Sequence, residues 1–222
     1  MMARVVAILL LLVSCSDLTG RDYPAHLLHK PFAIQYAGMD SMLHRLLPID
    51  SVKVYEEVGQ MEQWAKDNND MQLSYYARLL LHAYQVNRKG IDNRYVAEQL
   101  PALVSAIDEQ DMPHLRAYAE NMLGNYYWRD YRKYNTAFEH SLAAYNSYSR
   151  FSAKEFPPKA SYLYDLGLDY YRFKDYATAL TYLNEAKNTP ADNNNPRYFN
   201  VLNTIGLCYR HMEKYDSAEY YF

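Results

Sequence analysis

Two stretches near the end of the chain, LYDLGLDYYRFKDYATALTYL at 163–183 and LNTIGLCYRHMEKYDSAEYYF at 202–222, carry one pattern 39 residues apart. The paired positions are Leu163 and Leu202, Leu166 and Ile205, Gly167 and Gly206, Tyr170 and Tyr209, Tyr176 and Tyr215, Ala179 and Ala218, Tyr182 and Tyr221, and Leu183 and Phe222. A fixed offset of this length is typical of stacked structural units. The sequence therefore predicts an array whose function lies in a surface built by stacking rather than in a catalytic pocket.

An earlier copy of the pattern precedes these two. Its members are Leu123-Gly124, Tyr127, Tyr134, Ala137 and Ala144, with one extra residue in its turn. The clearest copy continues to Ala186 and Pro190. Further upstream, Leu80-Leu81 and Tyr84 lie 43 residues before Leu123-Gly124 and Tyr127, but no glycine is present. We therefore count three recognisable units and one degenerate unit.

The order of these residues resembles the tetratricopeptide repeat, a helical hairpin of ~34 residues with Leu-Gly, a Tyr three residues later, small residues in the second helix and often a closing Pro. The resemblance implies an all-α fold, a right-handed superhelical α-solenoid of antiparallel helical hairpins. The glycines here are 43 and 39 residues apart, so we expect lengthened connections at 149–158 and 191–196.

The motif residues are expected to act through packing. A Gly or Ala at a helix crossing lets two backbones approach, whereas a larger side chain would push them apart. Tyr170 and Tyr209 are expected to fill the gap between units. The predicted packing set is Leu123, Gly124, Tyr127, Ala137, Leu166, Gly167, Tyr170, Ala179, Ala186, Ile205, Gly206, Tyr209 and Ala218.

Helical periodicity also extends upstream of the repeats. Apolar residues recur every three or four positions over 51–67, 71–86 and 93–109, which predicts three more helices. Ser51 is a candidate N-cap, and Pro113 marks the next helix start. Pro101 falls inside the third span, so that helix is either kinked or begins there. Helical signals over 25–47 are interrupted by prolines, and this region either starts the array or caps it.

Composition excludes some classes of function. Half of the 222 residues are hydrophobic, which is ample for a buried core. With 26 acidic and 23 basic residues and no dense Lys/Arg block, the chain has no electrostatic footprint for nucleic acid. The 25 tyrosines are the outlier, since tyrosine combines apolar area with a hydroxyl that can face water or a ligand.

The N-terminus is typical of an export signal. Residues 1–14 contain Arg4 and an unbroken apolar run at 5–13, which is too short to span a bilayer. The sequence Leu-Val-Ser-Cys that ends at Cys15 resembles the lipobox of bacterial lipoproteins, in which the cysteine is acylated. An ordinary secretory peptide with an incidental cysteine and a poorly cleaved anchor remain alternatives. If Cys15 is lipidated, Cys208 is the one remaining thiol, and a buried apolar role is expected for it.

These signals divide the chain into a signal peptide (1–14), a lipid-anchored tether (15–24), a helical N-terminal region with the degenerate repeat (25–112) and a repeat array (113–222). The last repeat stops at Phe222, midway through its expected second helix. A final unit normally carries a polar capping helix. We therefore expect either a fragment of a longer protein or a frayed end.

In such arrays the first helix of each hairpin lines the concave face, which predicts a partner-binding groove. Its residues are Tyr118, Asn121, Asn125, Trp128, Arg129, Tyr164, Leu168, Tyr171, Arg172, Asn200, Asn203, Arg210 and His211. Converging Asn, Arg and aromatic side chains suit an extended peptide. The alternative is that these residues form solvated helix faces. Members of the family that bind chaperones clamp a terminal carboxylate with lysines and asparagines, and lysine is absent from these positions, so a chaperone is not the expected partner.

Catalytic motifs are absent from the sequence, since it has no Gly-rich phosphate loop, His-Glu-x-x-His, Gly-x-Ser-x-Gly or Cys-x-x-Cys. His26, His29 and His44 are closely spaced, but a surface group is the simpler interpretation than a metal site. We expect no enzyme, no cofactor and no metal.

Two functions remain. The first is a lipid-anchored scaffold that binds a protein or peptide at the periplasmic side of a bacterial envelope. The second is the extracytoplasmic sensor region of a longer signalling protein, with a histidine kinase or DNA-binding output beyond residue 222. A hydrophobic span of ~20 residues after residue 222 would favour the sensor.

Overall fold

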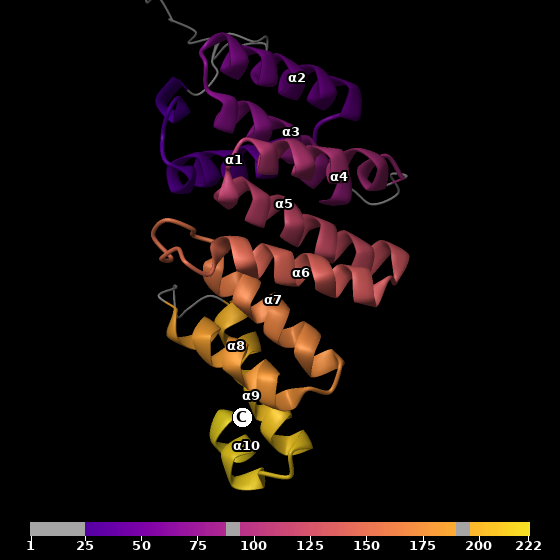
Figure 1. Cartoon of the computed structure of the whole chain (residues 1–222), viewed down its shortest axis with the longest axis vertical. Helices are drawn as coiled ribbons and strands as arrows, with labels where there is room; N and C mark the ends of the chain where they lie inside the picture. The colour runs from indigo at the N-terminus through magenta and orange to yellow at the C-terminus, as the bar shows by residue number, and fades with distance from the viewer. Residues whose placement is uncertain (1–24, 88–93, 190–195) are drawn as a thin grey trace, which may run out of the picture.

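The computed structural model describes residues 25–87, 94–189 and 196–222 (Figure 1). The predicted signal peptide, Cys15 and the tether lie outside these residues, as does most of the expected connection at 191–196. The elements are η1 (Ala25–Leu27), α1 (Phe32–Leu46), α2 (Ser51–Asp67), α3 (Met71–Asn87), α4 (Arg94–Glu109), α5 (Pro113–Tyr126), η2 (Tyr127–Tyr131), α6 (Tyr134–Tyr148), α7 (Lys159–Arg172), α8 (Tyr176–Asn188), α9 (Pro196–His211) and α10 (Tyr215–Tyr221). Within the described ranges, every one of these elements is helical.

The helices pack in consecutive pairs along the long axis of the molecule (Figure 1). The closest pairs are α5 with α6 and α7 with α8, and each second helix also contacts the first helix of the next pair. Most neighbouring odd-numbered helices also contact one another, namely α1 with α3, α3 with α5 and α7 with α9, and α5 and α7 both line one pocket. The odd helices therefore form an inner layer, and the predicted all-α solenoid of antiparallel helical hairpins is confirmed.

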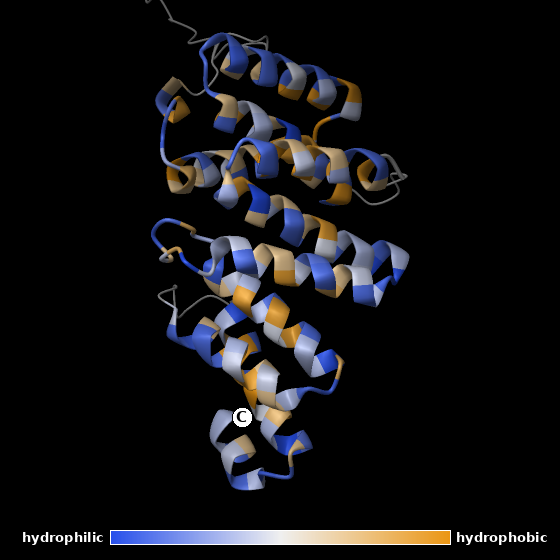
Figure 2. Ribbon diagram, in the orientation of Figure 1, coloured by the Kyte–Doolittle hydropathy of each residue, from blue (hydrophilic) through white to orange (hydrophobic). Residues whose placement is uncertain are grey.

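One continuous core joins the stacked layers. Buried apolar residues from Leu27 in η1 to Cys208 in α9 form a single cluster. Apolar and polar residues are mixed along the helices (Figure 2), as expected where each helix buries one stripe against its neighbours. No described helix is both long and apolar enough to cross a membrane.

The motif glycines lie where two helices come closest. A Cβ on Gly167 would lie 2.8 Å from Leu183 Cγ, and a Cβ on Gly206 would lie 2.8 Å from the ring of Phe222. At Gly124 the nearest atom would be the Ala137 carbonyl oxygen, at 3.1 Å. Real Cβ atoms do not tolerate contacts below about 3 Å in a close-packed interior, so Gly167 and Gly206 allow their hairpins to close.

A stacked ring pair recurs beside each of these glycines. Tyr170 stacks on Tyr182, with ring centroids 5.3 Å apart, and Tyr209 stacks on Tyr221 at 5.8 Å. In the earliest copy Tyr127 stacks on His140, at 5.4 Å. Tyr170 also meets Phe138 of the preceding hairpin edge to face, so its ring bridges two units.

The extra residue of the earliest copy is accommodated in a π-helical turn. After α5 the chain continues as η2, and its C-cap Arg132 takes a left-handed backbone with φ 54°. Lys174 and Glu213 take the same backbone at the matching turns of the next two hairpins. A π turn is the usual way for a helix to hold one inserted residue. The insertion thus leaves the hairpin turn itself unchanged.

The degenerate unit lacks the glycine and packs differently. Leu81 occupies the position of Gly124, and α4 makes a less extensive contact with α3 than α6 makes with α5. Tyr84, at the position of Tyr127, is fully buried and donates a hydrogen bond to the Ile49 carbonyl, 2.8 Å away. Pro101 lies inside α4, so the helix continues through it rather than starting there.

The predicted N-cap of α2 is wrong by one residue. Ser51 is the first helical residue, and Asp50 is the N-cap, with its carboxylate accepting a hydrogen bond from the Val52 amide at 2.9 Å. Both residue types cap helices well, and the charged oxygen of Asp50 also complements the helix dipole. The other predicted boundary, the helix start at Pro113, is confirmed.

The long connection at 149–158 is partly exposed, but it is anchored by an aromatic clasp. We use this name for Phe151 and Phe156. Phe156 is fully buried and stacks on Phe32 of α1 and on Tyr148 of α6, each at 5.4 Å. Phe151 stacks on His114 of α5 at 3.8 Å. The clasp therefore ties the N-terminal region to the repeats.

A buried carboxylate holds the segment that precedes α1. Asp70 accepts hydrogen bonds from the His29 amide at 2.6 Å, from Gln35 Nε2 at 3.0 Å and from the Leu73 amide at 2.9 Å. These donors come from the segment before α1, from α1 and from the first turn of α3. Asp70 is thus well satisfied although it is only 4% exposed.

Candidate functional site

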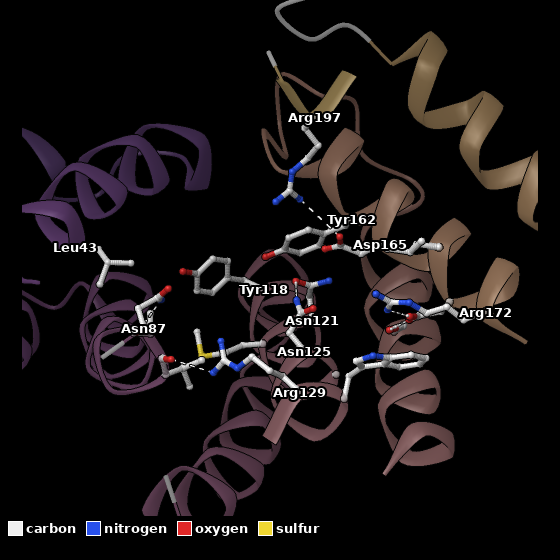
Figure 3. Close-up of a pocket in the computed structure, with 18 residues that line it drawn as sticks. Leu43, Asn87, Tyr118, Asn121, Asn125, Arg129, Tyr162, Asp165, Arg172 and Arg197 are labelled. Atoms are coloured by element: carbon white, nitrogen blue, oxygen red, sulfur yellow. Dashed lines mark hydrogen bonds and ion pairs between the residues drawn. The ribbon is translucent and has the colours of Figure 1, made fainter. Parts of the chain in front are cut away.

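A pocket of about 570 Å³ opens on the inner layer (Figure 3). Each of the five odd-numbered helices contributes to its wall, together with η2 and one residue of α6. The lining residues are Leu43, Ala83, Val86, Asn87, Tyr118, Asn121, Met122, Gly124, Asn125, Trp128, Arg129, Ser141, Tyr162, Asp165, Leu168, Asp169, Arg172 and Arg197. This volume is within the ordinary range for small ligands or single side chains of a partner.

Helical spacing explains why α5 and α7 dominate the pocket. On α5 the lining residues are Tyr118, Asn121, Met122, Gly124 and Asn125, which recur within one turn of one another. On α7 they are Tyr162, Asp165, Leu168, Asp169 and Arg172. Side chains at these spacings share one face of a helix. Gly124 of α5 also lines the pocket, so this face borders the close approach of α5 to α6.

Two carboxyl groups lie one turn apart on α7 and face the pocket. Asp169 is 6% exposed, and its Oδ2 accepts a hydrogen bond from Ser141 Oγ at 2.9 Å. Its Oδ1 lies 3.4 Å from Arg172 Nη1. Asp165 Oδ1 lies 3.7 Å from Arg197 Nη1, which comes from the first turn of α9 (Figure 3). Each aspartate therefore has one arginine partner at the rim.

Burial dominates the protonation of both carboxyl groups. It raises the pKa of Asp165 to about 6, against the lowering effects of Arg197 and of the side-chain hydrogen bond from Asn121. Burial likewise raises the pKa of Asp169, although Ser141 and Arg172 act in the opposite direction. The arginines therefore compensate the desolvation of these carboxylates only in part.

The arginines are anchored by other partners. The guanidinium of Arg172 lies over the ring of Trp128, 4.4 Å from its centroid. Arg129 Nη2 donates to the Val86 carbonyl at 2.9 Å and pairs with Asp130 at 3.0 Å. Arg197 also donates to the Ser161 hydroxyl. These contacts hold the guanidinium groups at the rim of the pocket rather than over its floor.

Amide and phenol groups complete the polar surface. Asn125 Nδ2 donates to Asn121 Oδ1 at 3.0 Å, and Asn121 is 7% exposed. The ring of Tyr162 lies beside Asp165, and Tyr118 lies on the far side of Tyr162, toward Leu43 (Figure 3). Burial raises the pKa of both phenols, so both stay protonated and can donate a hydrogen bond.

Seven of the predicted groove residues line this pocket: Tyr118, Asn121, Asn125, Trp128, Arg129, Leu168 and Arg172. The others do not. Tyr171 and His211 form a separate cluster with Tyr176, in which Tyr176 stacks on His211 at 5.0 Å. Asn200, Asn203 and Arg210 are exposed on α9, and Tyr164 is half-buried on α7.

Sequence reasoning missed the acidic part of the pocket. Asp165, Asp169 and Tyr162 lie on the same face of α7 as Leu168 and Arg172, so helical spacing from those two residues could have found them. Arg197, Leu43 and Asn87 come from other helices, and no local spacing indicates them. The predicted packing residues, by contrast, are all buried or half-buried.

Other candidate chemistry in the described part of the chain is sparse. Cys208 is fully buried, and burial raises its thiol pKa to about 11, which keeps it protonated at neutral pH. No group of three or more His, Cys, Asp or Glu residues among the described positions has the arrangement of a metal site. His26, His29 and His44 thus belong to no such group.

The comparisons with known proteins add little to this geometry. No protein-family model matches the chain, and no curated protein matches it. One solved structure that is similar is the crystal structure of BtubC (BKLC) from P. vanneervenii. The two share 16% sequence identity over 88% of each chain, with a TM-score of 0.48.

Proposed function

We propose that this chain is a non-catalytic scaffold of the tetratricopeptide repeat type, which binds an extended segment of a partner protein on its inner layer. One observation carries the proposal: all five odd-numbered helices converge on one polar and aromatic pocket. Concave faces of helical repeat proteins are their usual binding surfaces. The pocket therefore marks the centre of the binding face.

The chemistry of the wall suits a peptide. The amides of Asn87 and Asn125 can donate to and accept from a peptide backbone, which is rich in both kinds of group. Trp128 and Arg172 form a stacked pair at the rim, and these two residue types dominate binding energy in protein interfaces. Leu43, Val86 and Met122 supply apolar contact on the opposite wall.

The experiment compares two pairs of substitutions of similar chemistry. Trp128→Ala with Arg172→Ala removes the stacked pair at the pocket. Tyr171→Ala with His211→Ala removes an aromatic and basic pair outside it. Partners would be captured from bacterial envelope extracts on immobilised full-length protein, and circular dichroism would check helicity. We expect the first variant to lower capture about tenfold or more, since interface hot spots contribute ~2 kcal/mol each.

The matched variant is expected to retain capture within about twofold, because its residues do not contact the pocket. Equal capture by the two variants, with helicity intact, would remove the pocket from the binding face.

The cellular place of the scaffold is part of the same proposal. Cys15 carries a lipid that anchors the mature protein in a bacterial membrane, with the repeats on the periplasmic side. The support is the order of features in the sequence: a basic residue, a short apolar run, a small residue and a cysteine. Cys15→Ala should release the protein from membranes in fractionation. An unchanged membrane fraction would refute the anchor.

A further inference from the structure

The positive and the negative side chains of the pocket differ in how far they are exposed to solvent. The three arginines at its rim have side chains 41–52% exposed, whereas Asp169 is 8% and Asp165 25% exposed by side chain. Charges in contact with water are screened, and charges in a protein interior act with a lower effective dielectric constant. The field on the floor of the pocket is therefore set by the two aspartates, although arginines outnumber them.

The aspartates also keep capacity to accept further hydrogen bonds. A charge-assisted hydrogen bond between a guanidinium and a carboxylate is ~2.7–2.9 Å long. The Arg172–Asp169 and Arg197–Asp165 separations are 3.4 and 3.7 Å, so neither pair forms a close fork. Ionised carboxylates offer about four acceptor sites each. The contrast is Asp70, whose two oxygens receive three short hydrogen bonds.

The walls above the aspartates fit the stem of a long side chain. Tyr162 lies beside Asp165, and Tyr118 lies beyond it toward Leu43 (Figure 3); aromatic faces attract cations. Leu43, Met122 and Leu168 add apolar surface. A lysine or arginine side chain combines a cationic tip with an apolar stem, and it buries that stem readily.

We propose that the pocket receives a lysine or arginine side chain of the bound peptide, with Asp165 and Asp169 as its counter-charges and Tyr118 and Tyr162 along its stem. This inference rests on the proposed function and names the chemistry of the partner. The raised pKa values of the two aspartates agree with it, because burial outweighs the lowering effect of the nearby arginines and a bound cation would offset that burial. An acidic peptide that pairs with the rim arginines is the competing outcome.

The test is a selection from a library of short random peptides on the immobilised full chain. We expect the enriched peptides to share a lysine or arginine at one fixed position. The best of them is then synthesised with that residue unchanged, acetylated if it is lysine, or replaced by norleucine. Loss of the cation should weaken binding to the wild-type protein about tenfold or more, since hydrogen bonds to charged groups contribute ~1.5–3 kcal/mol.

The protein side of the test uses Asp165→Asn with Asp169→Asn, which removes both charges but keeps side-chain volume and an acceptor for Ser141. The control is Glu219→Gln, an exposed position on α10. The double variant should bind the basic and norleucine peptides about equally, with no loss of melting temperature, and the control should keep the preference.

The outcomes separate the two proposals. Enrichment of acidic peptides, or a preference for the basic residue that survives in the double variant, overturns the inference and leaves the binding face in place. If no peptide is enriched over the bare support, and the pocket variants capture envelope proteins as well as the parent does, the proposed function falls and the inference falls with it.

Discussion

The two ends of the solenoid are both built from stacked helices, but their helices pair differently and have different residues at the crossings. From α5 to α10 each hairpin has a glycine at the close approach and a stacked ring pair beside it. From α1 to α4 the equivalent glycine is Leu81, and the layers are held by the Asp70 hydrogen bonds and by the clasp. The glycine and ring pair of the repeat motif are therefore one way to stack helices. Buried aromatic and polar contacts take their place in the N-terminal half.

The largest expected effect comes from removing the clasp. Phe156→Ala deletes a fully buried ring that packs on α1 and α6, and buried Phe→Ala changes cost about 3–5 kcal/mol. Denaturant titration of parent and variant would measure the loss in free energy of unfolding. Hydrogen exchange should show faster exchange in α1 than in α9. Equal acceleration in both helices would contradict the role of the clasp as the joint between the two regions.

Replacement of Asp165 or Asp70 by asparagine should change the free energy of unfolding with opposite signs. Asp165 has a raised pKa, so the folded state binds more protons than the unfolded state between about pH 4 and 6. Its contribution to stability therefore improves as the pH falls through this window and is worst above pH ~6. Asp165→Asn should raise the free energy of unfolding at pH 7 by about 2 kcal/mol after allowance for partial exposure.

Asp70→Asn is the matched control and should lower stability by about 1–3 kcal/mol, because one of its acceptor oxygens is lost. His82 changes the free energy of unfolding in the opposite direction to Asp165 as the pH falls. Burial lowers the pKa of His82 to about 4, so the folded state loses stability as the unfolded chain takes up a proton on that ring. The measured quantity is therefore the free energy of unfolding of the Asp165→Asn variant minus that of the parent at each pH. A difference that does not shrink between about pH 6 and 4 would contradict the assignment to Asp165.

The smallest expected effect is on the melting temperature, when alanine replaces either of two helical glycines. A Cβ at Gly167 would meet Leu183 at 2.8 Å, whereas nothing lies within 4 Å of a Cβ at Gly59 in α2. Overpacking costs about 1–3 kcal/mol, and Gly→Ala in a helix otherwise gains about 0.5–1 kcal/mol. We expect Gly167→Ala to lower the melting temperature and Gly59→Ala to raise it. A rise in both would mean that the motif glycine is not needed for close approach.

Local signals were sufficient to predict the fold. The spacing of Gly167, Tyr170 and Ala179 predicted the hairpins because those residues meet within about twenty positions of one another. The apolar period over 51–67 predicted α2 to the residue, apart from its cap. The extra residue before Tyr134 was visible as a longer turn, but its form as a π turn depends on backbone geometry that no residue type specifies.

The candidate site was predicted only in part because it is assembled from distant segments. Trp128 and Arg172 are predictable because they occupy groove positions of the repeat motif. Arg197 is not, because it approaches Asp165 from another helix. Phe156 was overlooked for the same reason, since a buried ring inside a long connection has no periodic neighbours to indicate it. Contacts between layers depend on the superhelical path, which is set by all the crossings together.

The clasp has a consequence for how the chain folds and unfolds. A solenoid whose units contact only their neighbours behaves as a one-dimensional chain of weakly coupled elements, and it can fray from either end. The contact of Phe32 in α1 with Phe156 in the connection after α6 joins segments that are several units apart in sequence and closes a long loop. Closing such a loop slows folding, but it couples α1 to α6 energetically. We expect the segment between them to unfold as one cooperative block, with partial opening confined to α9 and α10.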